Sequence, residues 1–178
     1  MIDLNLLKDE DRLVISRINE KGRAWIVGGW VRDSLSGLMP TELDLATTLT
    51  PRDVQAIFPR SIMTGEKFGT TIVRIDDSEK ASYQCEVTTL RADGGYGDGR
   101  RPDNVVFGQE IEADLARRDF TINAMAVDDS GRLIDPFGGL DDLREGLLRT
   151  VGSAEERIGE DGLRVLRAFR FMGAEGGG

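Results

Sequence analysis

The sequence contains no histidine and only one cysteine, Cys85, among its 178 residues. The absence of histidine excludes Ser-His-Asp and Cys-His catalysis, HExxH metalloproteases and every histidine-ligated zinc site. A single cysteine excludes an internal disulfide and a cysteine-rich zinc site. Any catalysis by this chain must therefore rely on carboxylates, arginine, lysine, tyrosine or a bound metal.

Long apolar runs and an excess of positive charge are also missing. No apolar run approaches the length of a membrane span, and the acidic start MIDLNLLKDEDR lacks a signal-peptide core, so we expect a cytoplasmic protein without membrane contact. The net charge of -9 argues against a nucleic-acid coat over the whole surface but allows a local basic patch. The length suits one domain with a real core and a second fragment attached.

Apolar periodicity and turn residues predict alternating helices and strands. Helices are expected over residues 4–20, 30–37, 51–58, 112–128, 140–146 and most of 153–173. Strands are expected over 24–27, 42–46, 61–64, 70–75, 83–90 and, before a turn, within 132–139. The turn DDSEK favours antiparallel pairing of 70–75 with 83–90. Residues 91–104 hold four glycines and a proline without periodicity, which predicts a mobile loop.

Two carboxylates stand two residues apart in the predicted strand 42–46. Glu42 and Asp44 then point to one face of the sheet while Leu43 and Leu45 point to the other. Glu86, in another alternating strand, can join the pair from a neighbouring position. Three converging carboxylates repel one another unless a cation holds them, and hard oxygen ligands suit Mg²⁺ or Mn²⁺. The alternative is a solvent-facing acidic pair on an edge strand.

A glycine pair precedes these carboxylates. Gly28 and Gly29 break the strand 24–27 and open a helix whose first backbone N–H groups suit a phosphate. Arg32 can pair with phosphate oxygens in a bidentate manner. Taken alone, a Gly-Gly pair is an ordinary turn.

The stretch RRDFTINA is rich in polar donors. In the predicted helix 112–128, the adjacent Arg117 and Arg118 point about 100° apart, whereas Asp119 and Asn123 share a face. The latter two can contact a ribose or a base edge. The alternative is a helix with ordinary salt bridges.

A second acid–arginine pattern lies in EDGLRVLR. Glu160 or Asp161 shares a helix face with Arg164, and Arg167 follows one turn later. An acid–arginine pair on one face can hydrogen-bond the polar edge of a base. It is equally compatible with a plain ion pair.

Taken together, these motifs resemble the head of bacterial tRNA nucleotidyltransferases, the CCA-adding enzymes. That family belongs to the polymerase-β-like superfamily, as do bacterial poly(A) polymerases. The motifs occur in the family's order over residues 24 to 172: VGGWVRD, ELDLAT, EKFGT, EVTTLR, DGRRPD, DLARRDFTINAMA, LIDPFGGLDDL and EDGLRVLRAFRF.

The resemblance implies a mixed α/β fold, the polymerase-β-like nucleotidyltransferase head, with about five strands in a mixed sheet and helices largely on one face. The head would occupy residues 1–150, and 151–178 would begin a helical neck. The implied activity is metal-dependent, template-independent transfer of CMP or AMP from CTP or ATP to the 3′ end of tRNA, with release of pyrophosphate.

The resemblance also assigns roles to individual residues. Glu42 and Asp44 match the metal-binding pair, and Glu86 matches a further catalytic carboxylate. The loop 91–104 matches the segment tied to the switch from C to A addition. The matched nucleotide-binding positions are Gly28, Gly29, Arg32 and Asp33 for the triphosphate, Arg118, Asp119 and Asn123 for the sugar and phosphates, and Asp161, Arg164 and Arg167 around the base edge.

Two departures from the family pattern keep alternatives open. The family usually has Asp where this chain has Glu42, and its members continue into neck, body and tail regions that grip the tRNA. An enzyme adding only A or only C and a poly(A) polymerase are alternatives within the same chemistry, although TGEKFGT favours the tRNA-specific branch. A nucleotide-binding module without catalysis is the alternative from another class.

Overall fold

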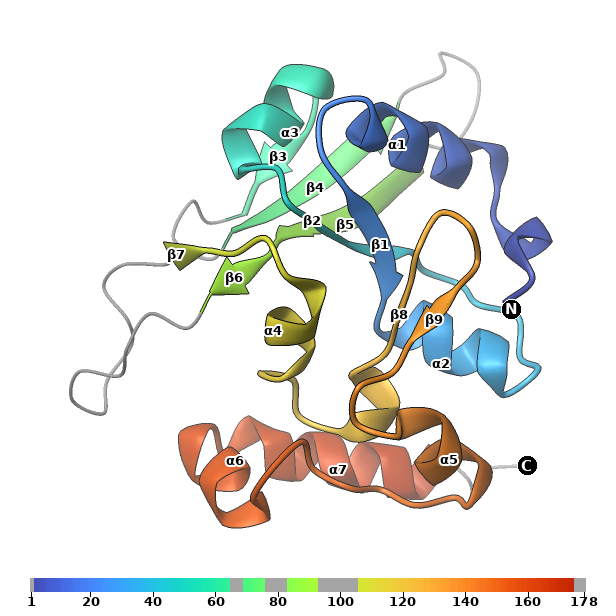
Figure 1. Cartoon of the computed structure of the whole chain (residues 1–178), viewed down its shortest axis with the longest axis vertical. Coiled ribbons are helices and arrows are strands. Elements are labelled where there is room, and N and C mark those ends of the chain that lie inside the picture. Colours follow the sequence, from blue (N-terminus) through green and yellow to red (C-terminus); the bar gives the residue numbers. More distant parts are fainter. Residues whose placement is uncertain (1, 65–68, 76–82, 93–105, 175–178) are drawn as a thin grey trace.

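The computed structural model describes residues 2–64, 69–75, 83–92 and 106–174 (Figure 1). A mixed sheet of seven strands forms its centre, in the order β3-β4-β5-β2-β1-β8-β9. Its strands are β1 (Ala24–Val27), β2 (Asp44–Thr47), β3 (Ile62–Met63), β4 (Thr70–Ile75), β5 (Tyr83–Thr89), β8 (Ala126–Val127) and β9 (Leu133–Ile134). β2 and β5 pair in parallel, and the other neighbours pair antiparallel. β6 (Arg91–Ala92) and β7 (Val106–Phe107) form a separate ribbon.

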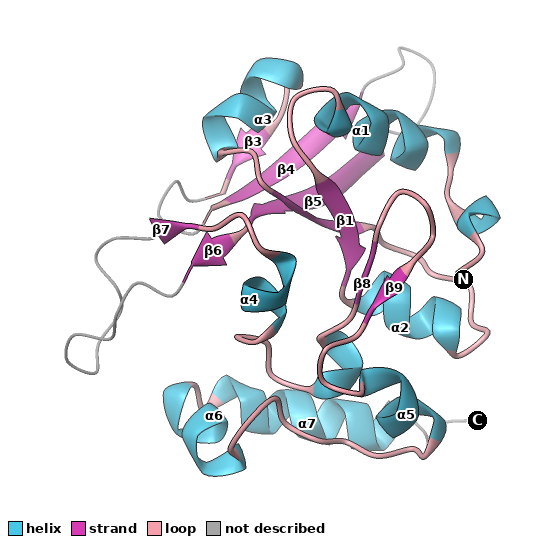
Figure 2. Ribbon diagram, in the orientation of Figure 1, coloured by secondary structure: helices cyan, strands magenta, loops and turns pink. Residues whose placement is uncertain are grey.

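The helices surround this sheet (Figure 2). They are α1 (Asp9–Asn19), α2 (Gly29–Leu35), α3 (Pro51–Ile57), α4 (Ile111–Leu115), α5 (Gly139–Arg144), α6 (Ala154–Glu160), α7 (Leu163–Ala174) and the 3-10 turns η1 (Leu4–Leu6) and η2 (Thr121–Asn123). α1 and α3 lie at one end of the molecule, α5, α6 and α7 gather at the other, and α2 and α4 lie between the two ends. No helix in these described ranges is both long and apolar enough to cross a membrane.

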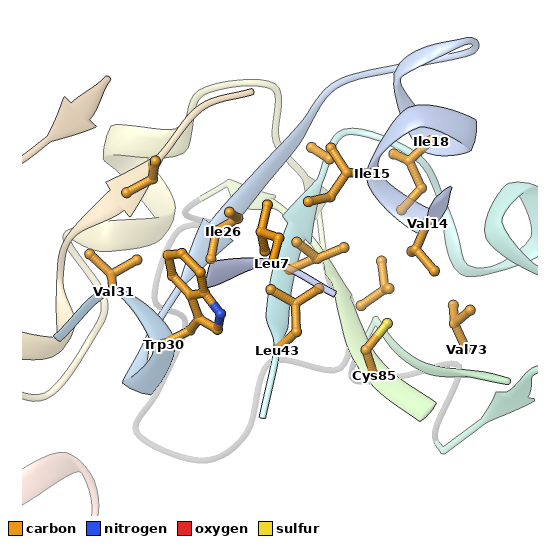
Figure 3. Close-up of a cluster of buried hydrophobic side chains, with 14 of the residues drawn as sticks. Leu7, Val14, Ile15, Ile18, Ile26, Trp30, Val31, Leu43, Val73 and Cys85 are labelled. Atoms are coloured by element: carbon orange, nitrogen blue, oxygen red, sulfur yellow. The ribbon is translucent and has the colours of Figure 1, made fainter. Parts of the chain in front are cut away.

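Alternation along β2 divides the core into two layers. Leu43 and Leu45 join the larger cluster, in which side chains of α1, α2 and α3 pack on one face of the sheet (Figure 3). Ala46 faces the smaller cluster on the opposite side, with Leu115 of α4. Burying each leucine contributes about 1.5–3 kcal/mol. The same alternation sends Asp44 away from the larger core.

The sheet confirms the expected mixed architecture, with helices α1, α2 and α3 together on one face. It has seven strands rather than about five, because β8 and β9 form an antiparallel hairpin that extends the sheet beyond β1. The predicted antiparallel pairing of 70–75 with 83–90 is confirmed by the β4–β5 register. The helix predicted from residue 51 is also present as α3, and its start is capped: the Thr50 side chain accepts a hydrogen bond from the Asp53 N–H.

The helix predicted over 112–128 is wrong beyond α4. After Leu115 the chain turns, Phe120 bridges Thr150, and residues 126–127 join the sheet as β8. The Asp119 carboxylate accepts a hydrogen bond from the Phe120 N–H at 2.9 Å, and the Val151 N–H donates to the Asp119 carbonyl. Helical spacing was overridden because these side-chain and long-range partners compete for the backbone.

Smaller corrections concern element ends. The helix predicted over 4–20 is divided into η1 and α1, because the Asp11 carboxylate accepts a hydrogen bond from the Lys8 N–H and starts a new helix. β2 begins at Asp44, so Glu42 precedes the strand. The turn DDSEK, most of EKFGT, most of the loop 91–104 with DGRRPD, and the terminal residues 175–178 lie outside the described residues.

Candidate nucleotide-binding and active site

A pocket of about 520 Å³ opens between the sheet, the segment after α4 and helix α7. Every residue predicted for the site lines this pocket except Glu86. The predicted residues that line it are Gly28, Gly29, Arg32, Asp33, Glu42, Asp44, Arg118, Asp119, Asn123, Asp161, Arg164 and Arg167. The structure therefore gathers residues from four separate stretches of the sequence into one cavity.

The glycine turn brings the backbone close to the acidic strand. Gly28 has φ +69°, and a side-chain carbon added there would lie 3.2 Å from Asp44 Oδ2 and 3.6 Å from Arg118 Nη1. A larger residue would be strained by this φ and would fill the space between these two charged groups. Gly28 thus keeps open the narrow gap where α2 begins.

Asp44 is the partly buried carboxylate of the acidic side. It pairs with Glu86 across the parallel strands β2 and β5, so both side chains leave the same face of the sheet. Burial and the nearby Glu86 raise the pKa of Asp44 from 3.8 to about 6, with a smaller contribution from Glu42 and an opposing one from Arg118. The negative charges of Glu86 and Glu42 near Asp44 are therefore only partly balanced by the positive charge of Arg118.

The expected convergence of three carboxylates is not formed in this structure. Within the described ranges, no group of three His, Cys, Asp or Glu side chains is close enough to hold one metal ion. Glu42 is exposed just before β2, and Glu86 is exposed outside the pocket lining. Glu42 and Asp44 do share the pocket wall, and hard carboxylate oxygens with uncompensated charge fit a divalent cation such as Mg²⁺.

Arg32, which also lines the pocket, is held by two polar partners. Its Nε and Nη2 donate to Asp33 Oδ1 at 3.0 and 2.8 Å, and its Nη1 donates to Asn123 Oδ1 at 2.8 Å. A side-chain carbon built on Gly29 would lie 3.5 Å from Arg32 Nη2, so this arginine sits directly beside the glycine turn. The arrangement fixes a guanidinium next to the helix start that suits phosphate.

Two further arginines surround one buried acid. Arg117 Nη2 donates to Asp114 Oδ1 at 2.6 Å, and Arg118 Nη2 lies 3.5 Å from Asp114 Oδ2. Arg118 Nη1 also donates to the Asn123 carbonyl at 3.3 Å. The Nε atoms of both arginines are buried without a hydrogen-bond partner in the described part of the chain. Both arginines also line the pocket, where their positive charge suits an anionic ligand.

Asp119 and Asn123 do meet, although not on a helix. Asn123 Nδ2 donates to Asp119 Oδ1 at 3.4 Å across the turn that contains η2. Arg167 Nε of α7 lies 3.0 Å from Asp119 Oδ2, an ion pair whose atoms are not aligned for a hydrogen bond. This contact links α7 to the segment after α4.

Asp161 and Arg164 both line the pocket, but they do not share a helix face as predicted: Asp161 is extended after α6, and α7 begins only at Leu163. The Asp161 carboxylate accepts a hydrogen bond from the Leu163 N–H at 2.9 Å, and Arg164 Nη1 donates to the Arg157 carbonyl at 2.8 Å. Arg157 in turn donates to the carbonyls of Ala116 and Val151 at 2.7 and 2.9 Å. The start of α7 is therefore attached to the segment after α4 through Arg157.

Sequence reasoning missed several lining residues. They are Trp30, Thr41, Arg170 and Phe171, together with Arg117, which was considered only as part of a helix. Arg170 continues the three-residue spacing of Arg164 and Arg167, and that spacing is a signal for it. No local signal marks Phe171, because its partners lie far away in the sequence.

Comparisons with known proteins agree with this geometry. Residues 24–149 match the family described as the poly A polymerase head domain. A CCA-adding enzyme of Geobacillus thermodenitrificans is 48% identical over 160 residues, which cover 89% of this chain and 38% of that protein. One of Bacillus licheniformis is 51% identical over 150 residues, covering 84% of this chain and 36% of that protein. The chain thus spans less than two fifths of these relatives.

Solved structures show the same likeness in three dimensions. The crystal structure of a Bacillus stearothermophilus CCA-adding enzyme in complex with CTP matches with a TM-score of 0.79 at 41% identity, over 93% of this chain and 39% of that one. A Thermotoga maritima CCA-adding enzyme complexed with tRNA matches with a TM-score of 0.69 at 26% identity, over 96% of this chain and 40% of that one. The family match extends across the sheet and most of the pocket walls, and the relatives named CCA-adding enzymes share this fold. The chain therefore belongs to the poly A polymerase head-domain family.

Proposed function

We propose that this chain is the catalytic head of a nucleotidyltransferase that adds CMP and AMP, from CTP and ATP, to the 3′ end of tRNA without a template. The observation that carries the proposal is one pocket in which a glycine turn, an acidic pair, the Asp161–Arg164 pair and five further arginines meet. The relatives named CCA-adding enzymes, one of them solved with CTP, support the choice of substrate class.

In the proposed reaction, the 3′-hydroxyl of the acceptor loses its proton to water, and its oxygen forms a bond to the α-phosphorus of the nucleotide. The bond between the α-phosphorus and the bridging oxygen breaks, and pyrophosphate leaves. Arg32 at the glycine turn and Arg118 at the buried turn after α4 bind the triphosphate and balance the charge of the departing group. Their protein partners hold both guanidinium groups in place before the nucleotide arrives.

The proposed metal ligands are Glu42 and Asp44, and the proposed ion is Mg²⁺, which Mn²⁺ can replace. The fit rests on two carboxylates in the pocket wall and on the elevated pKa of Asp44 beside Glu86 and Glu42. A divalent ion bound there would supply positive charge for the triphosphate and orient the attacking and leaving oxygens. Glu86 is proposed to add negative charge from the neighbouring strand.

We assign selection of the base to Asp161 and Arg164. Together an acid and an arginine offer an acceptor and several donors, the combination needed to hydrogen-bond the polar edges of cytosine and adenine. Asp119 and Asn123 are proposed to contact the sugar and phosphates, and Arg167 forms an ion pair with Asp119.

The proposal divides the chain into a head at 1–150 and the start of a neck at 151–178, with α6 and α7 in the second part. Both parts then contribute to the pocket, because Arg164 and Arg167 come from α7. Most of the tRNA-binding surface would belong to regions that the longer relatives have beyond the matched part. The cytoplasm stays the predicted compartment.

Incorporation of labelled nucleotide on several RNA acceptors tests the proposal. CTP and ATP are supplied separately and together to tRNA lacking its CCA end, with Mg²⁺ or with a chelator. Metal-dependent addition of both nucleotides to tRNA supports CCA addition, whereas addition of one nucleotide alone supports the A-only or CC-only alternative. Long A tails on other RNAs support a poly(A) polymerase. CTP binding without incorporation, in the chain and in a version extended as in its relatives, supports the nucleotide-binding module.

A further inference from the structure

Phe171 on α7 has no role in the site described so far, although it lines the pocket. Its ring lies beneath the guanidinium of Arg32, with 5.1 Å between Arg32 Cζ and the ring centroid. Arg170 Cζ lies 5.2 Å from the same centroid. Both distances are within the range in which a cation is attracted to an aromatic ring.

The ring completes the support of Arg32. A guanidinium carries five N–H groups in one plane, and the bonds to Asp33 and Asn123 use three of them, one on each nitrogen. Two N–H groups, one on Nη1 and one on Nη2, are therefore left for a ligand with respect to the described residues. Hydrogen-bond partners in the plane of the guanidinium prevent its rotation within that plane. Only a group packed against its flat face prevents the guanidinium from tilting out of the plane. Phe171 provides that group.

Phe171 is itself held from behind. Its ring meets Phe120 edge to face, with 5.9 Å between centroids and an interplanar angle of 81°. Phe120 is buried and forms a backbone bridge with Thr150, so it belongs to the rigid part of the molecule. The ring under Arg32 therefore has a fixed position and does not simply cover a mobile side chain.

The position of Phe171 on α7 connects two parts of the pocket. Arg164, proposed to select the base, precedes Phe171 by two helical turns, about 10 Å along the same helix. We infer that Phe171 is a positioning residue, which holds the guanidinium of Arg32 in the orientation that binds the triphosphate and so joins the base-selecting helix to the phosphate site. This inference rests on the proposed function, because it assigns Arg32 to a triphosphate.

The test compares the affinity of the chain for CTP and for inorganic tripolyphosphate, in Mg²⁺, by isothermal titration calorimetry. Phe171→Leu keeps apolar volume but removes the aromatic face, so affinity for both ligands should fall about 3- to 10-fold. Phe171→Tyr keeps the face and should bind both ligands like the unaltered chain. Phe169→Leu is the matched control, since Phe169 is 64% exposed on the same helix and does not line the pocket.

A double-mutant cycle separates positioning from simple attachment of α7. If Phe171 acts through Arg32, Phe171→Leu should change tripolyphosphate affinity less than about twofold when combined with Arg32→Ala. Losses that add in full, or a loss for CTP with none for tripolyphosphate, would overturn the inference. Failure of the unaltered chain to bind CTP would overturn the proposed function instead. Should Phe171→Leu not fold, Phe171→Met replaces it in every comparison, since methionine adapts to irregular apolar gaps.

Discussion

The acidic and basic walls of the pocket carry charges that are balanced in different ways. On the acidic wall, Asp44 has Glu86 and Glu42 as neighbours, and their negative charge contributes to its elevated pKa. On the basic wall, Arg32 and Arg117 each bond a carboxylate of the protein. Burial and these neighbours thus leave the acidic wall with negative charge that Arg118 offsets only in part, whereas the basic wall is already organised before the nucleotide binds. An organised wall avoids the cost of ordering side chains during binding.

The largest expected effect comes from removing the central charge of the acidic wall. Asp44→Ala deletes a proposed metal ligand and should lower nucleotide incorporation by about a thousandfold or more. CTP affinity measured in a chelator should change far less, because the basic wall is untouched. Single-turnover incorporation with labelled CTP measures the first effect and calorimetry the second. Activity within tenfold of the unaltered enzyme would remove Asp44 from the catalytic centre.

The second effect concerns selectivity on the basic wall. Arg164→Ala should reduce discrimination of CTP and ATP against UTP by about ten- to hundredfold, because hydrogen bonds to a base edge carry selectivity. Triphosphate affinity should be spared, since Arg32 and the glycine turn remain. Competition assays with all three nucleotides measure this. Unchanged preferences in Arg164→Ala would refute its base-edge role, and Leu166→Ala, an exposed change on the same helix, serves as the control.

The third effect tests the unusual residue on the acidic wall. Glu42 is one methylene longer than the aspartate usual in the family, and a misplacement of about 1 Å at a reacting centre can cost on the order of a hundredfold in rate. We therefore expect Glu42→Asp to raise Mg²⁺-dependent incorporation several-fold. The gain should be smaller in Mn²⁺, which we expect to tolerate the ligand geometry better. A lower rate in saturating Mg²⁺ would show that the glutamate is a tuned ligand.

Local sequence patterns predicted part of the fold and the face of the sheet on which Asp44 lies. The two-residue period of residues 42–45 placed Leu43 in the core and Asp44 on the opposite face, because strand alternation depends only on neighbouring residues. Thr50, Pro51 and Asp53 likewise predicted the start of α3. From the spacing alone, however, a solvent-facing acidic pair on an edge strand was the favoured interpretation. The family resemblance was needed to assign the site residues together.

What escaped prediction depends on distant partners. The helical pattern after Leu115 was overridden by contacts of Asp119 and Phe120 with residues 150 and 151, which no local window contains. The stacking of Arg32 on Phe171 joins α2 to α7 across most of the chain. Glu42 shows a related limit. Strand alternation predicted the face of the sheet to which its side chain points, but β2 begins only at Asp44, so Glu42 lies before the strand.

The smallest expected effect is a change in the free energy of unfolding, compared between variants of two carboxylates, Asp44 and Asp128. For Asp44, whose pKa is raised to about 6 from 3.8, the folded chain binds more protons than the unfolded chain between these values. Its contribution to the free energy of unfolding therefore falls as pH rises through this window. Asp44→Asn should consequently be more stable than the unaltered chain by about 1–2 kcal/mol at pH 7.5, a figure that allows for solvent screening of a partly exposed group.

Asp128, in the β8–β9 turn, should behave in the opposite way. Burial acts to raise the pKa of its carboxyl, but hydrogen bonds from Ser130 and Arg132, with the charge of Arg132, lower it below the usual value. A lowered pKa stabilises the folded chain at neutral pH, and this stabilisation is lost as pH falls through the folded-state pKa. Asp128→Asn should therefore be less stable at pH 7.5. Urea unfolding in a chelator from about pH 2.5 to 7.5 should show the gain of Asp44→Asn disappearing as pH falls from about 6 to 3.8, whereas the loss for Asp128→Asn should persist to about pH 4 and shrink only below it. A gain for Asp44→Asn that does not vary with pH would mean that it comes from packing rather than from the charge of the acidic wall.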